Sequence, residues 1–180
     1  MAIDLSEVKI RYTKLCDSYY LKQWLSEPGI LRWFPIYDDK ELDDSVKRWI
    51  DFSKLKCSIT ASYKGNPCGI ATMYLHPYKK LIHQCEFGII VGKNCRGGGV
   101  GNFLIQQLML LAKNKFKIEL IHLQVYEGNP AFGLYQKMGF KEFGRQDHWL
   151  KEENGEYAAR IFMERSLADI PTQEVTIPEH

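Results

Sequence analysis

The chain has 180 residues, of which 45% are hydrophobic, 26% charged and 13% aromatic. This length and composition predict one folded domain with a substantial hydrophobic core, and they exclude a disordered protein. The 24 basic and 22 acidic residues leave a formal net charge of +2, which is too balanced for a protein held on nucleic acid mainly by its phosphates. We therefore expect no nucleic-acid partner.

Membrane attachment and metal binding are not expected either. No apolar run approaches the roughly 20 residues that cross a bilayer, and the acidic N-terminal stretch lacks the layout of a signal peptide. The five cysteines form no C-x-x-C pair, which argues against a zinc site and favours free thiols in a reducing compartment. These features predict a cytoplasmic enzyme or small-molecule binder.

The hydrophobic periodicity predicts strands and helices along the whole chain. In chain order the expected elements are a strand at 8–12, helices beginning near 18 and 39, strands at 57–63, 68–75 and 82–91, a helix beginning near 100, a strand at 118–126, a short helix at 130–138, and a hairpin of strands at 140–150 and 157–167. This order predicts an α+β domain over residues 1–167 with a mixed sheet, because a strand–helix–strand unit implies a parallel pair. The polar tail at 168–180 is expected to be disordered.

A glycine-dense loop joins the strand at 82–91 to the helix that follows it. Its residues are Arg96, Gly97, Gly98, Gly99, Val100 and Gly101. Glycines permit positive φ and a close approach of backbone to ligand, and the first N–H groups of a helix are unpaired. With the charge of Arg96, these groups would hold a phosphate or pyrophosphate. The alternative is a glycine-rich turn without a ligand.

The loop matches neither common nucleotide-binding pattern. Asn102 stands where the dinucleotide pattern G-x-G-x-x-G needs its last glycine, and also where the P-loop needs a lysine. The loop instead resembles the pyrophosphate loop of the GCN5-related N-acetyltransferases, which reads R/Q-x-x-G-x-G/A. A second block, which contains Asn129, Leu134-Tyr135 and Gly139-Phe140, resembles the block that follows in this family.

The resemblance covers residues 8 to about 167 and implies the fold of that family. This fold is a mostly antiparallel, seven-stranded sheet whose central parallel pair splays apart to hold acetyl-CoA, with helices on both faces. One departure concerns the asparagine: many members place it seven residues before the tyrosine, where Gly128 stands here, and Asn129 is six before Tyr135.

The resemblance also implies an N-acetyltransferase that uses acetyl-CoA as co-substrate and no metal. The pantetheine amides are expected to pair with the backbone of Ile89, Ile90 and Val91 as an added strand would. Asn129 and Phe132 are expected to contact the cofactor as well. A primary amine would attack the thioester directly.

Two side chains are the expected catalytic groups. Tyr135 occupies the position of the family's usual general acid, and a phenol can protonate or hydrogen-bond the leaving thiolate. Glu86 is the leading candidate for the base, since a carboxylate in a largely buried strand has a raised pKa. The alternatives are helix packing for Tyr135 and a structural polar contact for Glu86. His83, His122 and Tyr126 are further candidates for the base.

The acceptor site is expected at an aromatic and acidic segment between the first two helices. Trp33, Phe34, Tyr37 and Asp38 would receive a cationic amine there, whereas the alternative is core packing for Trp33 and helix capping by Asp39. Residues 20–34 and the closing hairpin resemble several subgroups of the family, namely the ribosomal-protein N-terminal, spermidine and aminoglycoside 6′-N-acetyltransferases.

These likenesses leave several acceptors open. The preferred ones are a protein N-terminus or a small polyamine-like amine. Aminoglycoside 6′-N-acetylation is the alternative enzyme reaction, and a non-catalytic acyl-CoA-binding module is the alternative of another class. A homodimer is an expectation from the resemblance alone.

Overall fold

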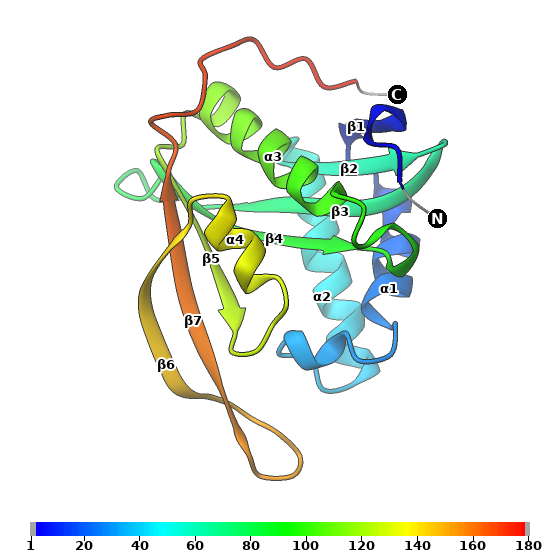
Figure 1. Cartoon of the computed structure of the whole chain (residues 1–180), viewed down its shortest axis with the longest axis vertical. Helices are drawn as coiled ribbons and strands as arrows, with labels where there is room; N and C mark the ends of the chain where they lie inside the picture. The colour runs from blue at the N-terminus through cyan, green and yellow to red at the C-terminus, as the bar shows by residue number, and fades with distance from the viewer. Residues whose placement is uncertain (1–2, 179–180) are drawn as a thin grey trace.

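Seven strands form one mixed sheet in the order β1-β2-β3-β4-β5-β7-β6 (Figure 1). The computed structural model describes residues 3–178. The strands are β1 (Val8–Tyr12), β2 (Ser58–Tyr63), β3 (Asn66–Leu75), β4 (Gln84–Val91), β5 (Leu120–Tyr126), β6 (Lys141–Lys151) and β7 (Tyr157–Ser166). The helices are α1 (Ser18–Leu25), α2 (Asp39–Asp51), α3 (Val100–Phe116) and α4 (Phe132–Lys137). The predicted α+β fold is confirmed.

The parallel pair of the sheet is β4 and β5, and all other neighbouring strands are antiparallel. The register of this pair covers only three residue pairs, of which the last is Glu86↔His122. β4 continues to Val91 and β5 to Tyr126 without further pairing between them. The two strands therefore separate beyond Glu86, as the resemblance implies.

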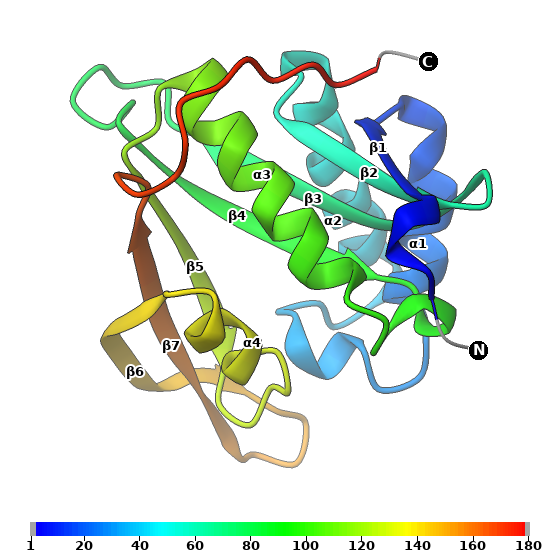
Figure 2. The same cartoon turned by 45° about the horizontal axis from the view of Figure 1, so that its top comes forward.

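Helices cover both faces of the sheet, α3 and α4 one face and α1 and α2 the other (Figure 2). This division follows from the alternation of side chains along each strand. Phe87 packs into the core beneath α3, whereas Ile90 packs into the cluster formed with α1 and α2. Even-numbered residues of β4 therefore face α2, and odd-numbered ones face α3.

Gly88 explains how α2 approaches the centre of the sheet. A Cβ atom at this position would lie 2.8 Å from the Trp49 ring and 2.9 Å from the Tyr74 hydroxyl. Any larger residue would push these side chains away from β4. The glycine inside the predicted strand thus marks a close approach of side chains to the backbone.

A buried ion pair fixes α1 to the edge of the sheet. The Asp17 side chain is 1% exposed and accepts two hydrogen bonds from Arg11, each 2.7 Å long. The Lys14 N–H and the Thr60 hydroxyl also donate to this carboxylate, both at 2.9 Å. Both oxygens of the buried carboxylate therefore accept hydrogen bonds, one of them from three donors, which compensates for the loss of water.

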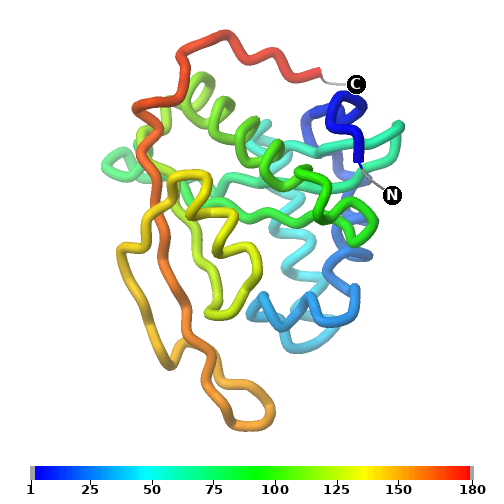
Figure 3. Tube along the Cα trace, in the orientation of Figure 1, coloured from blue at the N-terminus to red at the C-terminus, as the bar shows by residue number. Residues whose placement is uncertain are grey.

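The polar tail makes several contacts with α3 and the core, and its predicted disorder stays a prediction. Residues 168–178 form no helix or strand, yet they run along α3 at the edge of the molecule (Figure 3). Asn114 Oδ1 accepts a hydrogen bond from the Gln173 N–H at 2.9 Å, and Ile177 belongs to the hydrophobic core. Polar groups near the end of α3 and three apolar residues, Ile170, Val175 and Ile177, thus hold a segment that composition alone marks as polar. Residues 179–180 lie outside the described residues.

The thiols show no sign of pairing or metal binding in the described part of the chain. All five cysteines are free, and burial raises the pKa of Cys57, Cys68 and Cys85 to about 12. Residues 3–178 contain no group of three potential metal-ligating side chains. Over the same residues, no helix has the length and apolar composition that crossing a membrane requires.

Candidate active site

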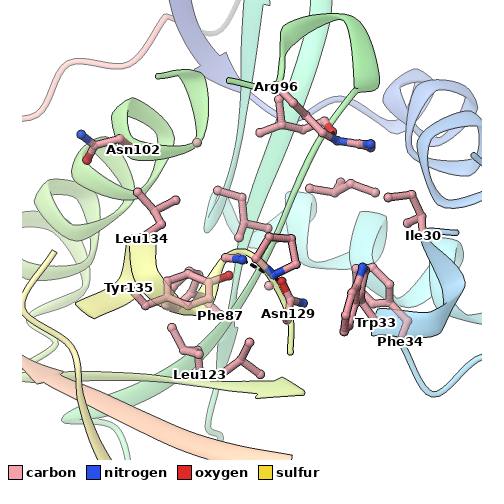
Figure 4. A pocket seen from close by; sticks show the side chains of 18 of the residues that line it. Ile30, Trp33, Phe34, Phe87, Arg96, Asn102, Leu123, Asn129, Leu134 and Tyr135 are labelled. Carbon is pink, nitrogen blue, oxygen red and sulfur yellow. Dashed lines mark hydrogen bonds between the residues drawn. The ribbon is translucent and has the colours of Figure 1, made fainter. Parts of the chain in front are cut away.

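A cavity of about 610 Å³ lies where β4 and β5 separate. Its size falls within the range of small-molecule sites. Figure 4 shows Trp33 and Phe34 across the cavity from Tyr135 and Leu134. The predicted site residues that line it are Trp33, Phe34, Ile89, Ile90, Val91, Arg96, Gly97, Gly99, Gly101, Asn129 and Tyr135.

The separation leaves backbone groups of β4 without a strand partner. The Gly92 N–H donates to Cys68 O on β3 at 2.9 Å, so by alternation the peptide groups of Ile90 also face β3. The peptide groups of Ile89 and Val91 face the gap instead. Of the three residues predicted to pair with a pantetheine arm, Ile89 is therefore placed to donate and accept there. Val91 is placed to donate, because its carbonyl accepts a hydrogen bond from Arg96 Nε at 2.7 Å.

The glycine loop supplies further free donors at one end of the cavity. Gly97 and Gly99 have φ of +76° and +82°, a conformation that favours glycine. The first N–H that donates back into the helix is that of Phe103, to Gly99 O at 3.0 Å, so the N–H groups of the preceding helical residues have no intrahelical acceptor. No atom lies within 4 Å of a Cβ built on Gly97. The loop is thus an open cradle for an anion.

Two loop residues do not line this cradle with side-chain atoms. Val100 is 1% exposed and packs into the core. Gly98 faces the N-terminal segment, where a Cβ would lie 2.6 Å from that of Ile3. Their predicted role in cofactor binding is therefore limited to the backbone.

Arg96 is held by the protein as well as facing the cavity. Its Nε donates to Val91 O at 2.7 Å, and its Nη2 forms an ion pair with Glu27. Glu27 also accepts a hydrogen bond from the Lys93 N–H at 3.0 Å. This carboxylate, which the sequence analysis missed, fixes the orientation of the loop and neutralises part of the Arg96 charge.

Tyr135 lies in α4 with its ring in the core. It packs edge-on against Phe87 and Phe140, with centroid distances of 6.2 and 5.9 Å. Burial raises the pKa of Tyr135 to about 12. The residue lines the cavity, and its hydroxyl group points into it (Figure 4). The ring of Tyr135 therefore packs in the core, as the helix-packing alternative expects. Its hydroxyl faces the cavity, where the general-acid prediction requires it.

Glu86 is the last residue of β4 that pairs with β5. Its Oε2 accepts a hydrogen bond from Gln124 Nε2 at 3.0 Å, and Gln124 Oε1 accepts one from Arg160 Nη1 at 2.6 Å. Burial raises the pKa of Glu86, although the Gln124 hydrogen bond and the Arg160 charge oppose the rise. Gln124 lines the cavity and Glu86 does not. The Gln124 carboxamide therefore lies between the Glu86 carboxylate and the cavity.

The other candidate bases do not line the cavity. His83 is exposed. The ring of His122 stacks on that of His76 at 6.4 Å, and burial lowers the pKa of His122. Tyr126 is 6% exposed, and burial raises its pKa. His122 stands opposite Glu86 where the strands part, but its ring stacks on His76 and does not line the cavity.

Asn129 shapes the turn before α4. Its Oδ1 accepts a hydrogen bond from the Ala131 N–H at 2.9 Å, and its carbonyl accepts one from the Phe132 N–H at 3.0 Å. These bonds place the start of α4 two residues later than predicted. Phe132 packs against the core and does not line the cavity, which differs from its predicted contact with the cofactor.

The predicted acceptor residues divide into two groups. Trp33 and Phe34 line the cavity, whereas Tyr37 and Asp38 do not. Asp38 accepts a hydrogen bond from the Glu41 N–H at 2.8 Å as the N-cap of α2. The capping role that was considered for Asp39 thus belongs to Asp38. Tyr37 is 72% exposed.

Tyr37 nevertheless connects two parts of the acceptor side. A hydrogen bond to Glu153 raises the pKa of the Tyr37 hydroxyl. Glu153 lies between β6 and β7, and Tyr37 lies between α1 and α2. The contact therefore joins the aromatic loop to the tip of the hairpin.

Gln124 and Arg160 are the main polar residues that the sequence analysis missed. In β5, His122, Gln124 and Tyr126 occupy successive alternate positions, so one face of the strand carries polar or amphipathic side chains after Leu120. That alternation is a signal the sequence does contain. The sequence contains no comparable signal for Arg160, because its place beside Gln124 depends on the register of β7 with β5.

The sequence model of the acetyltransferase (GNAT) family matches residues 18–140. The chain belongs to this family. The match covers the glycine loop, both strands of the parallel pair and the Tyr135 helix, and so includes every residue that lines the cavity.

Two curated relatives in this family share about half their length with the chain. An N-alpha-acetyltransferase of Sulfurisphaera tokodaii is 31% identical over 107 residues, which are 59% of this chain and 53% of the relative. YwnH of Bacillus subtilis (strain 168) is 27% identical over 110 residues, which are 61% of this chain and 55% of YwnH. Its name, a provisional one, is phosphinothricin acetyltransferase.

Solved structures of the family share the fold across almost the whole chain. A ribosomal-protein-alanine N-acetyltransferase from Brucella melitensis superposes with a TM-score of 0.72 at 22% identity, covering 87% of this chain and 98% of that one. The structure of yncA from Salmonella typhimurium with its cofactor acetyl-CoA gives 0.75 at 16% identity, covering 94% and 99%. At these identities the likeness concerns the fold alone.

Proposed function

We propose that this GNAT protein transfers the acetyl group of acetyl-CoA to a primary amine. The observation that carries the proposal is the separation of β4 and β5 directly after Glu86. It leaves a cavity with unpaired backbone groups along one wall, free helix N–H groups at one end and Tyr135 on the opposite wall. These are the groups that a pantetheine arm, a pyrophosphate and a leaving thiolate require.

The residues present fit this cofactor. The open space above Gly97 leaves room for a pyrophosphate at the free N–H groups of residues 97–102. Ile89 and Val91 would pair with the amides of the pantetheine arm. The chemistry that acetyl-CoA supplies when bound is a thioester that an amine can attack.

Glu86 is the proposed base. An acceptor amine is mostly protonated near neutral pH and must lose a proton before it can attack. Burial raises the pKa of Glu86 above its usual value. The carboxylate is therefore a stronger base than an exposed glutamate. Because Gln124 stands between Glu86 and the cavity, we infer that the proton passes through a water molecule or after a shift of the Gln124 amide.

Tyr135 is the proposed hydrogen-bond donor to the leaving sulfur. Its pKa of about 12 keeps the phenol protonated over the whole physiological range. The ring is fixed by Phe87 and Phe140, so the hydroxyl needs little reorganisation to donate. This arrangement matches a general acid that stabilises developing negative charge.

The acceptor classes predicted from the sequence remain proposals. A protein N-terminus is supported by the names of the Sulfurisphaera and Brucella relatives. A polyamine-like amine is supported by a solved spermidine N-acetyltransferase chimera with a TM-score of 0.72. Homodimer formation and a cytoplasmic location also remain predictions, which light scattering and fractionation can check.

The test is release of free CoA thiol from acetyl-CoA in the presence of a panel of amines. We expect release with at least one primary amine and a matching acetylated product by mass spectrometry. Calorimetry in parallel measures acetyl-CoA binding. Binding without thiol release for any amine would show a silent acyl-CoA-binding module and overturn the proposal.

A further inference from the structure

Three polar side chains cross the sheet beside the cavity on the face of α2. They are Glu86 on β4, Gln124 on β5 and Arg160 on β7. The odd-numbered neighbours Leu123 and Val125 belong to the core beneath α3, so Gln124 faces the opposite side. The two hydrogen bonds, 3.0 and 2.6 Å long, use opposite ends of a single carboxamide. A carboxylate and a guanidinium thus stand on either side of one residue of the cavity wall.

Arg160 is held rigidly in this position. Its guanidinium lies 3.4 Å from the centroid of the Trp149 ring and 4.5 Å from that of Phe162. Besides Gln124, it donates to Gln146 Oε1 at 2.9 Å. Stacking on both rings and two hydrogen bonds fix the plane of the guanidinium before any ligand arrives.

The charge of Arg160 has no carboxylate partner within residues 3–178. Arg11, Arg96, Arg145 and Arg165 each form an ion pair with an aspartate or glutamate. The hydrogen-bond partners of Arg160 are neutral amides, and its Nε is buried without an acceptor among the described residues. A fixed guanidinium with unused donors is the group that proteins use to bind carboxylates and related oxyanions.

We propose that Arg160 recognises an anionic group on the acceptor, and that the acceptor is therefore an amino acid or a close analogue with a free carboxylate or similar oxyanion. This inference rests on the proposed function, acetyl transfer to a primary amine, and it replaces the protein N-terminus and the polyamine considered there as acceptors. The ammonium group of such an acceptor meets Glu86, and its anion meets Arg160. A polyamine would instead place a second positive charge beside the guanidinium, and a peptide N-terminus has no α-carboxylate.

The test compares free amino acids with their α-amides as acceptors. Amidation removes the negative charge and also lowers the pKa of the amine, which by itself makes the amide more reactive. We expect kcat/KM to favour the acid by about tenfold or more, the effect of a hydrogen-bonded charge. Spermidine and a short peptide complete the panel and should be poorer acceptors.

Arg160→Gln should abolish the preference for the acid, mainly by raising KM for the acceptor, and Arg160→Lys should restore part of it. Arg145→Gln is the matched control, because Arg145 lies in the same hairpin but is neutralised by Glu127 and Asp147. It should leave the preference unchanged. Thermal melting and acetyl-CoA calorimetry confirm that each variant folds and binds the cofactor.

Three results would overturn the inference. They are equal or better use of the amide by the wild type, a preference that survives in Arg160→Gln, and acetylation of spermidine or the peptide but of no amino acid. In each case an amine is acetylated, so the proposed function stands. If acetyl-CoA binds but none of the amines causes thiol release, the proposed function and this inference are both rejected.

Discussion

Gln124 Nε2 donates to Glu86 Oε2 at 3.0 Å across the point where β4 and β5 part. The bond fixes the carboxylate beside the cavity while leaving its second oxygen free of any hydrogen bond to the residues the structure describes. It also opposes the effect of burial on the pKa of Glu86. One amide group thus orients the proposed base and adjusts its proton affinity.

The acid side of the pH–rate profile tests the role of Glu86. The carboxyl must be ionised to accept a proton, so kcat/KM should fall as the pH falls through the raised pKa of Glu86. Glu86→Gln should lower kcat by about 10²–10⁴-fold and remove this acid limb. A variant that retains wild-type kcat and the same limb would exclude Glu86 as the base.

Gln124→Leu tests the hydrogen bond itself. Loss of the donor removes an interaction that lowers the pKa of Glu86, so the acid limb should move to higher pH. The measurement is kcat/KM from pH 5 to 9 with a saturating concentration of acetyl-CoA. A limb that stays in place or moves to lower pH would show that Gln124 does not adjust the base.

The fold of this chain could be predicted from sequence to a large extent. All seven strands and four helices occur where the periodicity places them, with ends that differ by a few residues. The glycine loop and Tyr135 could be located because they lie in short contiguous motifs. Contiguous motifs need no knowledge of which strands are neighbours.

The parts that the sequence could not provide depend on tertiary register. Glu27 meets Arg96 only because the end of α1 packs beside the loop after β4. Arg160 meets Gln124 only because β7 inserts between β5 and β6. Ile177 lies in a tail of polar composition and reaches the core through contacts that composition does not predict. No local pattern encodes such contacts.

Tyr135→Phe should separate chemistry from binding. Removal of one hydroxyl leaves the packing on Phe87 and Phe140 intact, so the affinity for acetyl-CoA should change little. We expect kcat to fall by about 10²-fold or more. Because the pKa of Tyr135 is about 12, the wild type should show no loss of activity from ionisation of this residue below about pH 10. An unchanged kcat would remove Tyr135 from the mechanism.

Gly97→Glu tests the anion cradle, with Gly65→Glu as a matched control. The two glycines have φ of +76° and +82°, and neither has an atom within 4 Å of a built Cβ. The conformational strain of the substitution is therefore similar. Only Gly97 lines the cavity, so Gly97→Glu alone should abolish acetyl-CoA binding by calorimetry. Equal affinities for the two variants would rule out the loop as the pyrophosphate site.

Asp17→Asn should destabilise the fold without changing the chemistry. Removing the charge from a 1% exposed carboxylate leaves Arg11 without its partner, which costs about 3–5 kcal/mol of unfolding free energy. Urea denaturation measures this loss. Kinetic constants measured well below the melting temperature should stay near those of the wild type.

The Arg11–Asp17 ion pair also predicts how the stability of the fold depends on pH. Burial raises the pKa of Asp17, but the hydrogen bonds from Arg11 and Lys14 outweigh it, so the folded-state pKa is lowered. The stabilisation is therefore present above the unfolded pKa and is lost as the pH falls through the lower, folded value. The wild type should lose its advantage over Asp17→Asn below about pH 4. A constant difference down to pH 2 would contradict this account.

A crystal structure of the protein with bound CoA tests the central claim most directly. The account predicts the diphosphate at the backbone N–H groups of residues 97–102 and the pantetheine arm along Ile89 and Val91, with its sulfur near Tyr135. Density for CoA at any other place, or an empty β4–β5 gap at a CoA concentration that saturates the protein in calorimetry, would contradict it.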